Sequence, residues 1–426
     1  KRRNPSIDTS IFDFLRDILL LEKFENFSDA TRQQQIEFVV KFQQCTGPIM
    51  AKGLEDTAFY IYNRLIALNE VGGEPDHFGI TLENFHGRNR TRFTETPNTL
   101  LTLTTHDTKR SEDLRARIAV LSEIPREWQG WLESWRKMNF DFKANLEGEL
   151  APSANEEYML YQTFIGTWPF TPEEVNETYI GRLQQFFLKA IKEAKVNSTW
   201  IQPNPEWEEA AQKFISSVLQ REHPFLKSMT EVMQVVGWHG MLNSLTQTIL
   251  KMTTPGVPDL YQGTELWDFS LVDPDNRRPV DYGQRRQALE QVEGTPLEQW
   301  FHEWPSGYIK LAVVHKLLLF RRKHPALFQE GAYASYYASG PLADCCVSFS
   351  RKHNNDRLLV IVPRLTTRLG KPNGSFEWQD TQILLDEAFP GMKDLLTGRE
   401  LKAGTDTVPL KLLNGFPFAA FTNVEV

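Results

Sequence analysis

A cluster of ionisable side chains follows a short apolar segment in the first third of the chain. Segment 99–105 is β-branched and apolar on both faces, which is typical of a buried parallel strand, and it leads into His106, Asp107, Lys109 and Arg110. The C-terminal ends of parallel strands are where an α/β barrel keeps its catalytic groups. A carboxylate there could stabilise a developing positive charge, and the neighbouring imidazole could donate to a hydroxyl. The same spacing also allows Asp107 to cap the helix that follows.

Two further polar clusters are candidate sites. Lys52, Glu55 and Asp56 lie together, but acids are also favoured by the dipole at a helix start, so a well-capped helix is the alternative. Loop 273–278 is densely polar and follows an expected short strand at 256–263. Its Asp-Pro and Asn residues are equally typical of a surface turn.

Other kinds of site are disfavoured by the sequence. The nine histidines show no paired metal-ligand spacing, and the Gly-rich phosphate motifs are absent, so neither a metal nor a nucleotide is expected. A net charge of -8 argues against a nucleic-acid partner. The longest apolar stretches, such as 309–320, contain charged residues, so no membrane span is expected. Three cysteines cannot form a disulfide framework, which favours a reducing, cytoplasmic setting.

The elements that must position these residues can be predicted from the pattern of apolar residues. A length of 426 residues suits about two or three domains. Helical spacing of apolar residues predicts helices over 11–19, 29–44, 54–68, most of 111–252 and 283–324. Asp8 to Ser10 are the expected caps of the first helix, and Gly47-Pro48 is the expected end of the second. Beyond Pro325 the pattern changes to short strands at 332–337, 345–351, 358–363, 381–385 and 418–424, which predicts a small C-terminal β-domain.

Longer blocks of the sequence resemble the maltooligosyl trehalose synthase family of the α-amylase superfamily. They are RRNPSID (2–8), GPIMAKGLEDTAFYIYNRLIALNEVGG (47–73), THDTKRSEDLRARIAVLSEIP (105–125), TTPGVPDLYQGTELWDFSLVDPDNRRPVDY (253–282) and RRKHPALF (321–328). The resemblance implies an α/β fold: the C-terminal part of a (β/α)8 TIM barrel with a large helical insertion, then an antiparallel β-sandwich-like domain. The implied divisions are a partial barrel at 1–124, the insertion at 125–236, the end of the barrel at 237–325 and the β-domain at 326–426.

The resemblance also implies an activity and roles for residues. The family is an intramolecular transglucosylase that converts the reducing-end α-1,4 linkage of a maltooligosaccharide into an α,α-1,1 linkage, without a metal or organic cofactor. Asp107 matches the carboxylate that stabilises the transition state, and His106 matches its hydroxyl-binding partner. Positions that match glucan-binding residues near the reducing end or at the pocket rim are Lys52, Glu55, Lys109, Arg110, Asp275, Asn276 and Arg278.

The chain departs from the family in one respect. The family's nucleophile and general acid/base lie in an Arg-x-Asp-His block and a Glu-Lys-Ile-Leu-like block, and neither block occurs here. The chain also starts without Met, so we expect a C-terminal portion that lacks the first barrel strands. Its partners would be an α-1,4-glucan and the missing N-terminal part of the same protein, and alone it would be inactive. The alternatives are a hydrolase relative, such as a trehalohydrolase or an amylase, and a non-catalytic glucan-binding module.

Overall fold

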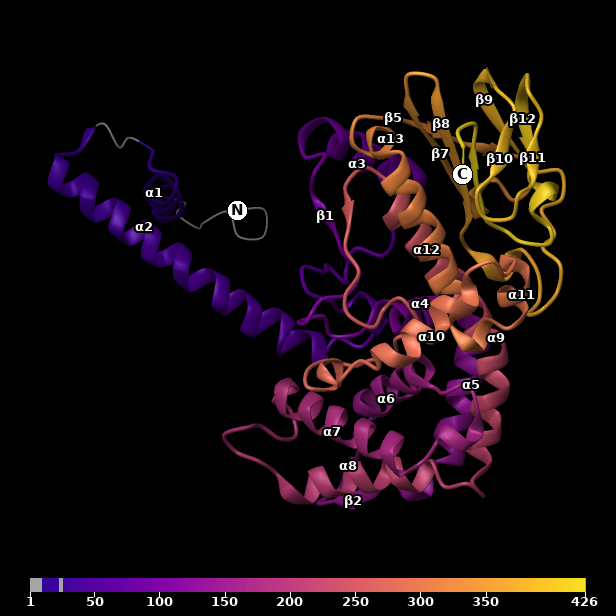
Figure 1. Cartoon of the computed structure of the whole chain (residues 1–426). Helices are drawn as coiled ribbons and strands as arrows, with labels where there is room; N and C mark the ends of the chain where they lie inside the picture. Colours follow the sequence, from indigo (N-terminus) through magenta and orange to yellow (C-terminus); the bar gives the residue numbers. More distant parts are fainter. Residues whose placement is uncertain (1–9, 23–25, 426) are drawn as a thin grey trace. The chain divides into compact units, whose positions relative to one another are not determined.

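The computed structural model describes residues 10–22 and 26–425 (Figure 1). The chain forms two units, one up to Ile61 and one from Tyr62 onward, and each is described by itself. The RRNPSID block and the expected caps Asp8 and Thr9 lie outside the described residues.

The first unit contains two helices, α1 (Ser10–Leu19) and α2 (Asp29–Met50). Ser28 caps α2 by accepting a hydrogen bond from the Thr31 N–H at 3.3 Å. The expected end of this helix at 47–48 is wrong, because the helix continues through Pro48 and the Ala51 N–H donates to the carbonyls of Gly47 and Pro48. Proline removes its own N–H from the ladder and crowds the carbonyl four residues earlier, but the helix continues beyond it here.

A helix over 54–68 is also a wrong prediction. The chain instead makes a π-helical turn at Ala51–Glu55 and two 3-10 turns, at Ala58–Tyr60 and Ile66–Leu68. The apolar residues of this stretch are spaced as on a helix. Phe59, Tyr60 and Ile66 are nevertheless buried while they lie in separate short turns. Burial of the side chains therefore decided the local structure, and the periodicity did not.

The second unit begins with a largely helical region, as expected. Its helices pack around buried aromatic side chains, among them Trp135, Phe164 and Phe225, whose rings contact one another. In Figure 1, α5 to α8 lie at the opposite end of this unit from the C-terminal strands. The helices are α3 (Leu82–Glu95), α4 (Glu112–Val120), α5 (Pro125–Met138), α6 (Ala154–Thr167), α7 (Glu177–Ala194), α8 (Pro205–Val218) and α9 (Pro224–Thr253), with a hairpin of β2 (Ala144–Leu146) and β3 (Glu149–Ala151).

A pair of parallel strands lies before the polar turn. Strand β1 (Leu100–Leu101) pairs in parallel with β4 (Val257–Pro258), with Leu100 opposite Val257, which confirms a parallel strand at each of the two predicted places. The expectation that the strand within 99–105 is buried is wrong, because Leu100 is 68% exposed. Within the described ranges this sheet has two strands, and no closed barrel is seen in them.

The C-terminal part confirms the predicted antiparallel β-domain. Four helices lead into it: α10 (Tyr282–Val292), α11 (Leu297–His302), α12 (Tyr308–Lys323) and α13 (Pro325–Gln329). A six-stranded sheet has the order β11-β10-β13-β8-β7-β5, and a three-stranded sheet has the order β12-β9-β6. The strands are β5 (Ala332–Tyr336), β6 (Ala338–Ser339), β7 (Cys346–His353), β8 (Asp356–Pro363), β9 (Gln382–Phe389), β10 (Met392–Asp394), β11 (Glu400–Leu401), β12 (Thr405–Pro409) and β13 (Ala419–Thr422).

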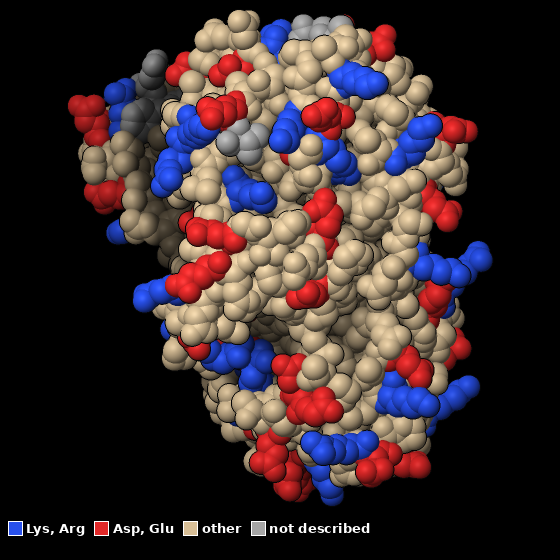
Figure 2. Space-filling model, turned by 45° about the vertical axis from the view of Figure 1, so that its right-hand side comes forward, with Lys and Arg blue, Asp and Glu red and all other residues tan. Residues whose placement is uncertain are grey.

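The central hairpin of that domain follows its sequence pattern. Strands β7 and β8 pair in register, with Phe349 opposite Val360, and most of their residues are buried on both faces. Acidic and basic side chains are interspersed over the face that Figure 2 turns to the viewer. No helix among residues 10–22 and 26–425 has the length and apolarity that a membrane crossing requires.

Candidate functional site

The predicted catalytic turn follows β1, and His106 and Asp107 are exposed in it. The turn is held locally, because the Thr108 hydroxyl donates to the Thr105 carbonyl at 3.0 Å and the Asp107 N–H donates to Thr105 Oγ1 at 3.2 Å. The alternative that Asp107 caps the next helix is wrong, since α4 starts at Glu112, five residues farther on. Asp107 therefore has no structural task at the start of α4.

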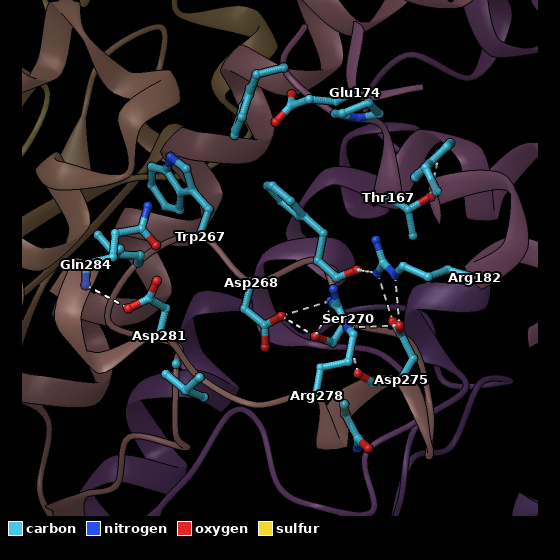
Figure 3. A pocket seen from close by; sticks show the side chains of 18 of the residues that line it. Thr167, Glu174, Arg182, Trp267, Asp268, Ser270, Asp275, Arg278, Asp281 and Gln284 are labelled. Atoms are coloured by element: carbon cyan, nitrogen blue, oxygen red, sulfur yellow. Dashed lines mark hydrogen bonds and ion pairs between the residues drawn. The ribbon is translucent and has the colours of Figure 1, made fainter. Parts of the chain in front are cut away.

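A pocket of about 720 Å³ lies between the helical region and the loops of residues 262–285 (Figure 3). This volume is within the range of small-molecule sites. Its wall combines the aromatic rings of Phe170, Trp267 and Phe269 with the charged groups of Arg182 and Asp268. Flat apolar faces beside hydrogen-bonding groups suit a ligand that has both an apolar face and many hydroxyls.

Loop 273–278 is a partly exposed turn, as the alternative predicted, and it also forms part of this pocket. Asp275, Asn276 and Arg278 all line it, and Asn276 is only 8% exposed. The Asp275 carboxylate accepts two hydrogen bonds from Arg182, both at 2.8 Å, and one from the Leu271 N–H at 2.8 Å. Burial alone would raise the pKa of Asp275, but the Arg182 guanidinium outweighs it and the pKa is lowered.

Hydrogen bonds join the turn that contains His106 and Asp107 to the pocket rim. The Asn276 side-chain amide donates to the His106 carbonyl at 2.8 Å. Arg110 forms an antiparallel bridge with Leu271, and the Ser111 N–H donates to the Ser270 carbonyl at 3.0 Å. The structure thus brings together two predicted clusters that are about 170 residues apart in sequence.

Lys109 and Arg110 are placed differently from His106 and Asp107. Their side chains are buried, and their backbone N–H groups both donate to the Glu70 carboxylate, at 2.7 and 3.1 Å. The Arg110 guanidinium lies 5.9 Å from the centre of the Phe186 ring. Their predicted role as glucan ligands stays a prediction, whereas their backbone holds the segment after the turn.

Lys52 and Glu55 belong to the first unit. Lys52 Nζ lies 2.5 Å from Asp56 Oδ2, and Glu55 is the last residue of the π-helical turn. The alternative of a helix start is wrong, because Asp56 follows the end of a helical segment. Their role as subsite residues stays a prediction.

A buried charge cluster behind the pocket was missed by sequence reasoning. It consists of Glu112 and Asp113 at the start of α4, Lys310 on α12 and Lys251 on α9. Lys310 Nζ donates to Glu112 Oε1 at 2.9 Å and to both Asp113 oxygens, at 3.0 and 2.9 Å. Lys251 Nζ lies 3.6 Å from Glu112 Oε2. A lysine inside the apolar run 309–320 was the available signal, since lysine is rarely buried unless paired.

The pKa values in this cluster are shifted by burial and by the neighbouring charges. Burial raises the pKa of Asp113, with Lys310 opposing and Glu112 adding to the increase. For Glu112 the two lysines outweigh burial, so its pKa is lowered. The two carboxylates likewise outweigh burial at Lys310, whose pKa is raised. The neighbouring opposite charges therefore favour the charged forms of Lys310 and Glu112.

The aromatic wall of the pocket rests on a second buried cation that the sequence did not reveal. The Arg117 guanidinium lies 3.5 Å from the centre of the Phe269 ring and 4.9 Å from that of Phe170, and it donates to the Trp168 carbonyl at 2.6 Å. Burial lowers the pKa of Arg117 to about 9, which leaves it charged at neutral pH. Arg117 therefore fixes both phenylalanines that face the pocket.

These features define an α/β protein with a polar turn after a parallel strand, an adjoining aromatic and charged pocket, and C-terminal antiparallel sheets. The described residues contain no group of three or more His, Cys, Asp or Glu side chains placed to hold a metal ion. No protein-family model matches the chain.

Comparison with known proteins identifies the relatives. A Mycobacterium tuberculosis protein with the provisional name of maltooligosyl trehalose synthase is 40% identical over 374 residues, which are 88% of this chain and 44% of that protein. The structure of maltooligosyltrehalose synthase from Arthrobacter ramosus matches with a TM-score of 0.74 and 35% identity, over 89% of this chain and 46% of that one. A Sulfolobus tokodaii structure described as a hypothetical maltooligosyl trehalose synthase matches with a TM-score of 0.71 and 30% identity, over 96% of this chain and 50% of that one.

The chain is a homologue of maltooligosyl trehalose synthase, and it spans about half the length of the relatives that it matches.

Proposed function

We propose that this chain supplies one side of the active site of a maltooligosyl trehalose synthase. The reaction would move the reducing-end glucose of a maltooligosaccharide from an α-1,4 to an α,α-1,1 linkage. The observation that carries the proposal is the hydrogen bond from Asn276 to the His106 carbonyl, which places the His106–Asp107 turn at the rim of an aromatic and charged pocket. Homology to this synthase supports the choice of substrate class.

The chemistry assigns Asp107 and His106 complementary tasks. Cleavage of a glycosidic bond passes through an oxocarbenium-like state with positive charge at the anomeric carbon. The exposed Asp107 carboxylate would stabilise that charge, and the His106 imidazole would donate to a ring hydroxyl. Lys52, Glu55, Lys109 and Arg110 remain proposed subsite residues, and Asp275, Asn276 and Arg278 are proposed to order the rim.

The pocket offers what an intramolecular transfer needs in addition to the reacting groups. A glucosyl-enzyme must be captured by a sugar hydroxyl before water reaches it, so the site has to hold the released glucose and exclude water. The rings of Phe170, Trp267 and Phe269 provide faces for glucose to stack on. The carboxylate of Asp268 and the guanidinium of Arg278 provide polar partners beside them.

Catalysis also requires a nucleophile and a general acid, which retaining enzymes place about 5 to 5.5 Å apart. The two blocks that carry them in the family do not occur in this sequence. We therefore expect negligible turnover from this chain alone. The decisive assay incubates it with maltopentaose and quantifies non-reducing product. Robust formation of that product would refute the division of the active site that we propose.

The hydrolase alternative can be distinguished from the synthase by the products of a longer protein. That protein must contain this chain and the two blocks that carry the nucleophile and the general acid. A synthase removes reducing ends without releasing free glucose, whereas a trehalohydrolase or an amylase releases sugar. Accumulation of free reducing sugar as the main product would reject the synthase in favour of the hydrolase.

A non-catalytic glucan-binding module is the second candidate, because Asp107 and His106 are not among the residues that line the pocket. Calorimetry with maltopentaose on the chain and on Asp107→Ala separates the two. Tight binding that is insensitive to Asp107→Ala favours the module, and weak binding by both favours a site completed by other segments.

A further inference from the structure

Lys310 occupies the centre of the buried charge cluster and belongs to neither of the segments around the site. Its side chain is fully buried on α12, and its ammonium group contacts the carboxylates of Glu112 and Asp113 at 2.9 to 3.0 Å. Glu112 and Asp113 are the first two residues of α4, where the free backbone N–H groups favour negative charge. One cation thus fixes two adjacent carboxylates.

Glu112 holds the segment that leads into the turn that contains His106 and Asp107. The Thr104 hydroxyl donates to Glu112 Oε2 at 3.1 Å, and the Glu112 N–H donates back to Thr104 Oγ1 at 3.0 Å. Thr104 is two residues before His106. The side chain of Glu112 therefore sets where the turn begins.

Asp113 holds the pocket segment. The Asp268 N–H donates to Asp113 Oδ2 at 2.8 Å, and Asp268 in turn accepts from the Ser270 N–H at 2.9 Å. Figure 3 draws Asp268 and Ser270 side by side in the pocket. The ring of Trp267, the residue before Asp268, has its centre 5.8 Å from Lys310 Nζ.

We propose that Lys310 is a positioning residue. By holding Glu112 and Asp113 in place, it fixes the positions of segments 104–108 and 268–270 relative to each other. A carboxylate without its cation in a buried site either takes up a proton or moves toward water, and both changes alter its hydrogen bonds. Loss of Lys310 therefore loosens both segments together, whereas loss of one carboxylate loosens only the segment that it holds.

Hydrogen exchange measured by mass spectrometry on the chain tests this. In Lys310→Met we expect exchange to rise about tenfold in both segments, with the amides of strands β7 and β8 unchanged. Glu112→Ala should affect 104–108 alone and Asp113→Ala 268–270 alone. Lys316→Met, on the same helix, is the matched control and should change neither segment.

A second variant keeps the test decisive if Lys310→Met unfolds. The triple variant E112Q/D113N/K310M carries no charge at the three positions, yet its amide oxygens can still accept hydrogen bonds. We expect it to fold and to exchange rapidly in both segments, because the remaining donors at Thr104 and Asp268 belong to the segments themselves and no ammonium group contacts both amides. Exchange like that of the wild type in the triple variant would show that the lysine only neutralises charge, and would overturn the proposal. A uniform rise across the whole second unit in every folded variant would overturn it too.

The consequence for a sugar ligand rests on the proposed function. In calorimetry with maltopentaose, Lys310→Met should weaken binding about tenfold if the wild type binds. If the wild type binds no glucan, the glucan pocket fails as a proposal, and the exchange data still decide the role of Lys310.

Discussion

The guanidinium of Arg182 and the carboxylate of Asp275 form a two-pronged ion pair, with Nε to Oδ1 and Nη2 to Oδ2 both at 2.8 Å. The pair joins helix α7 of the helical region to the loop at the pocket rim (Figure 3). Planar, paired hydrogen bonds of this kind fix orientation as well as distance. The loop that presents Asn276 to the His106 carbonyl is therefore held by a residue of the helical region.

Arg182→Met should destabilise the second unit by about 2 kcal/mol, because it leaves the largely buried Asp275 with only the half-exposed Arg278 as its cation. The measurement is urea unfolding followed by circular dichroism. Arg277→Met is the matched control in the same loop. Arg277 pairs with Asp273, but its side chain is 62% exposed, so the loss should stay within about 0.5 kcal/mol. Equal losses in both variants would contradict the structural role of Arg182.

Asp107→Asn tests the proposed charge stabilisation at constant size. In the longer protein that carries the nucleophile and acid, kcat/KM for maltopentaose should fall roughly 10²- to 10³-fold, because the amide cannot offset positive charge at the anomeric carbon. Asp141→Asn, an exposed carboxylate in the helical region, should leave the rate unchanged. A rate for Asp107→Asn within about threefold of the wild type would reject a charge-stabilising role.

Two helical glycines should respond in opposite directions to alanine. A Cβ at Gly240 on α9 would lie 2.6 Å from Arg117 Cγ and 2.9 Å from Arg117 Cα, so Gly240→Ala should cost about 1 to 3 kcal/mol. A Cβ at Gly130 on α5 meets nothing within 4 Å, so Gly130→Ala should stabilise by about 0.5 to 1 kcal/mol. Thermal unfolding of both variants measures the difference. A stabilised Gly240→Ala would mean that α4 and α9 do not pack this closely.

His239 should make stability depend on pH. It is buried on α9 with Nδ1 3.0 Å from Thr366 Oγ1, and burial lowers its pKa to about 4. Between pH 6.5 and 4 the unfolded chain therefore binds a proton at this residue that the folded chain does not. The contribution of neutral His239 is present at pH 7 and is lost as the pH falls through that window.

His239→Gln removes this dependence. The difference in the free energy of unfolding between wild type and variant should become smaller by about 1 to 2 kcal/mol when the pH is lowered from 7 to 5. Urea titrations at the two pH values provide the measurement, and the other titrating groups largely cancel in the difference. A gap that stays constant or widens on acidification would show that His239 is not held neutral.

The predictable features of the fold were those encoded over short stretches of sequence. Several C-terminal strands follow from alternation and turn residues, and β5, β7 and β8 begin and end within two residues of the expected ranges, whereas β6 was not predicted. The helix that passes through Pro48 and the short turns at 51–68 were mispredicted. For the short turns, burial of particular side chains outweighed the local signal.

The candidate site also contains features that the sequence predicted and features that it did not. The predicted clusters at 106–107 and 275–278 do meet, through Asn276 and the His106 carbonyl. Arg182, Arg117 and Lys310 were not predicted, because each contacts residues 49 to 198 positions away, and only the position of Lys310 within an apolar run gave a local signal. The burial of Lys109 and Arg110 was missed for the same reason.

The three-way contact of Lys310 with Glu112 and Asp113 also has an evolutionary consequence. Substitutions at these positions cannot be neutral one at a time, because each single change leaves an uncompensated charge in a buried site. Homologues with an apolar residue at the position of Lys310 should therefore lack the acidic residue at the position of Asp113, whereas an acidic residue at the position of Glu112 can still pair with Lys251. Drift at the three positions should be concerted, and the shape of the pocket should persist wherever the trio persists.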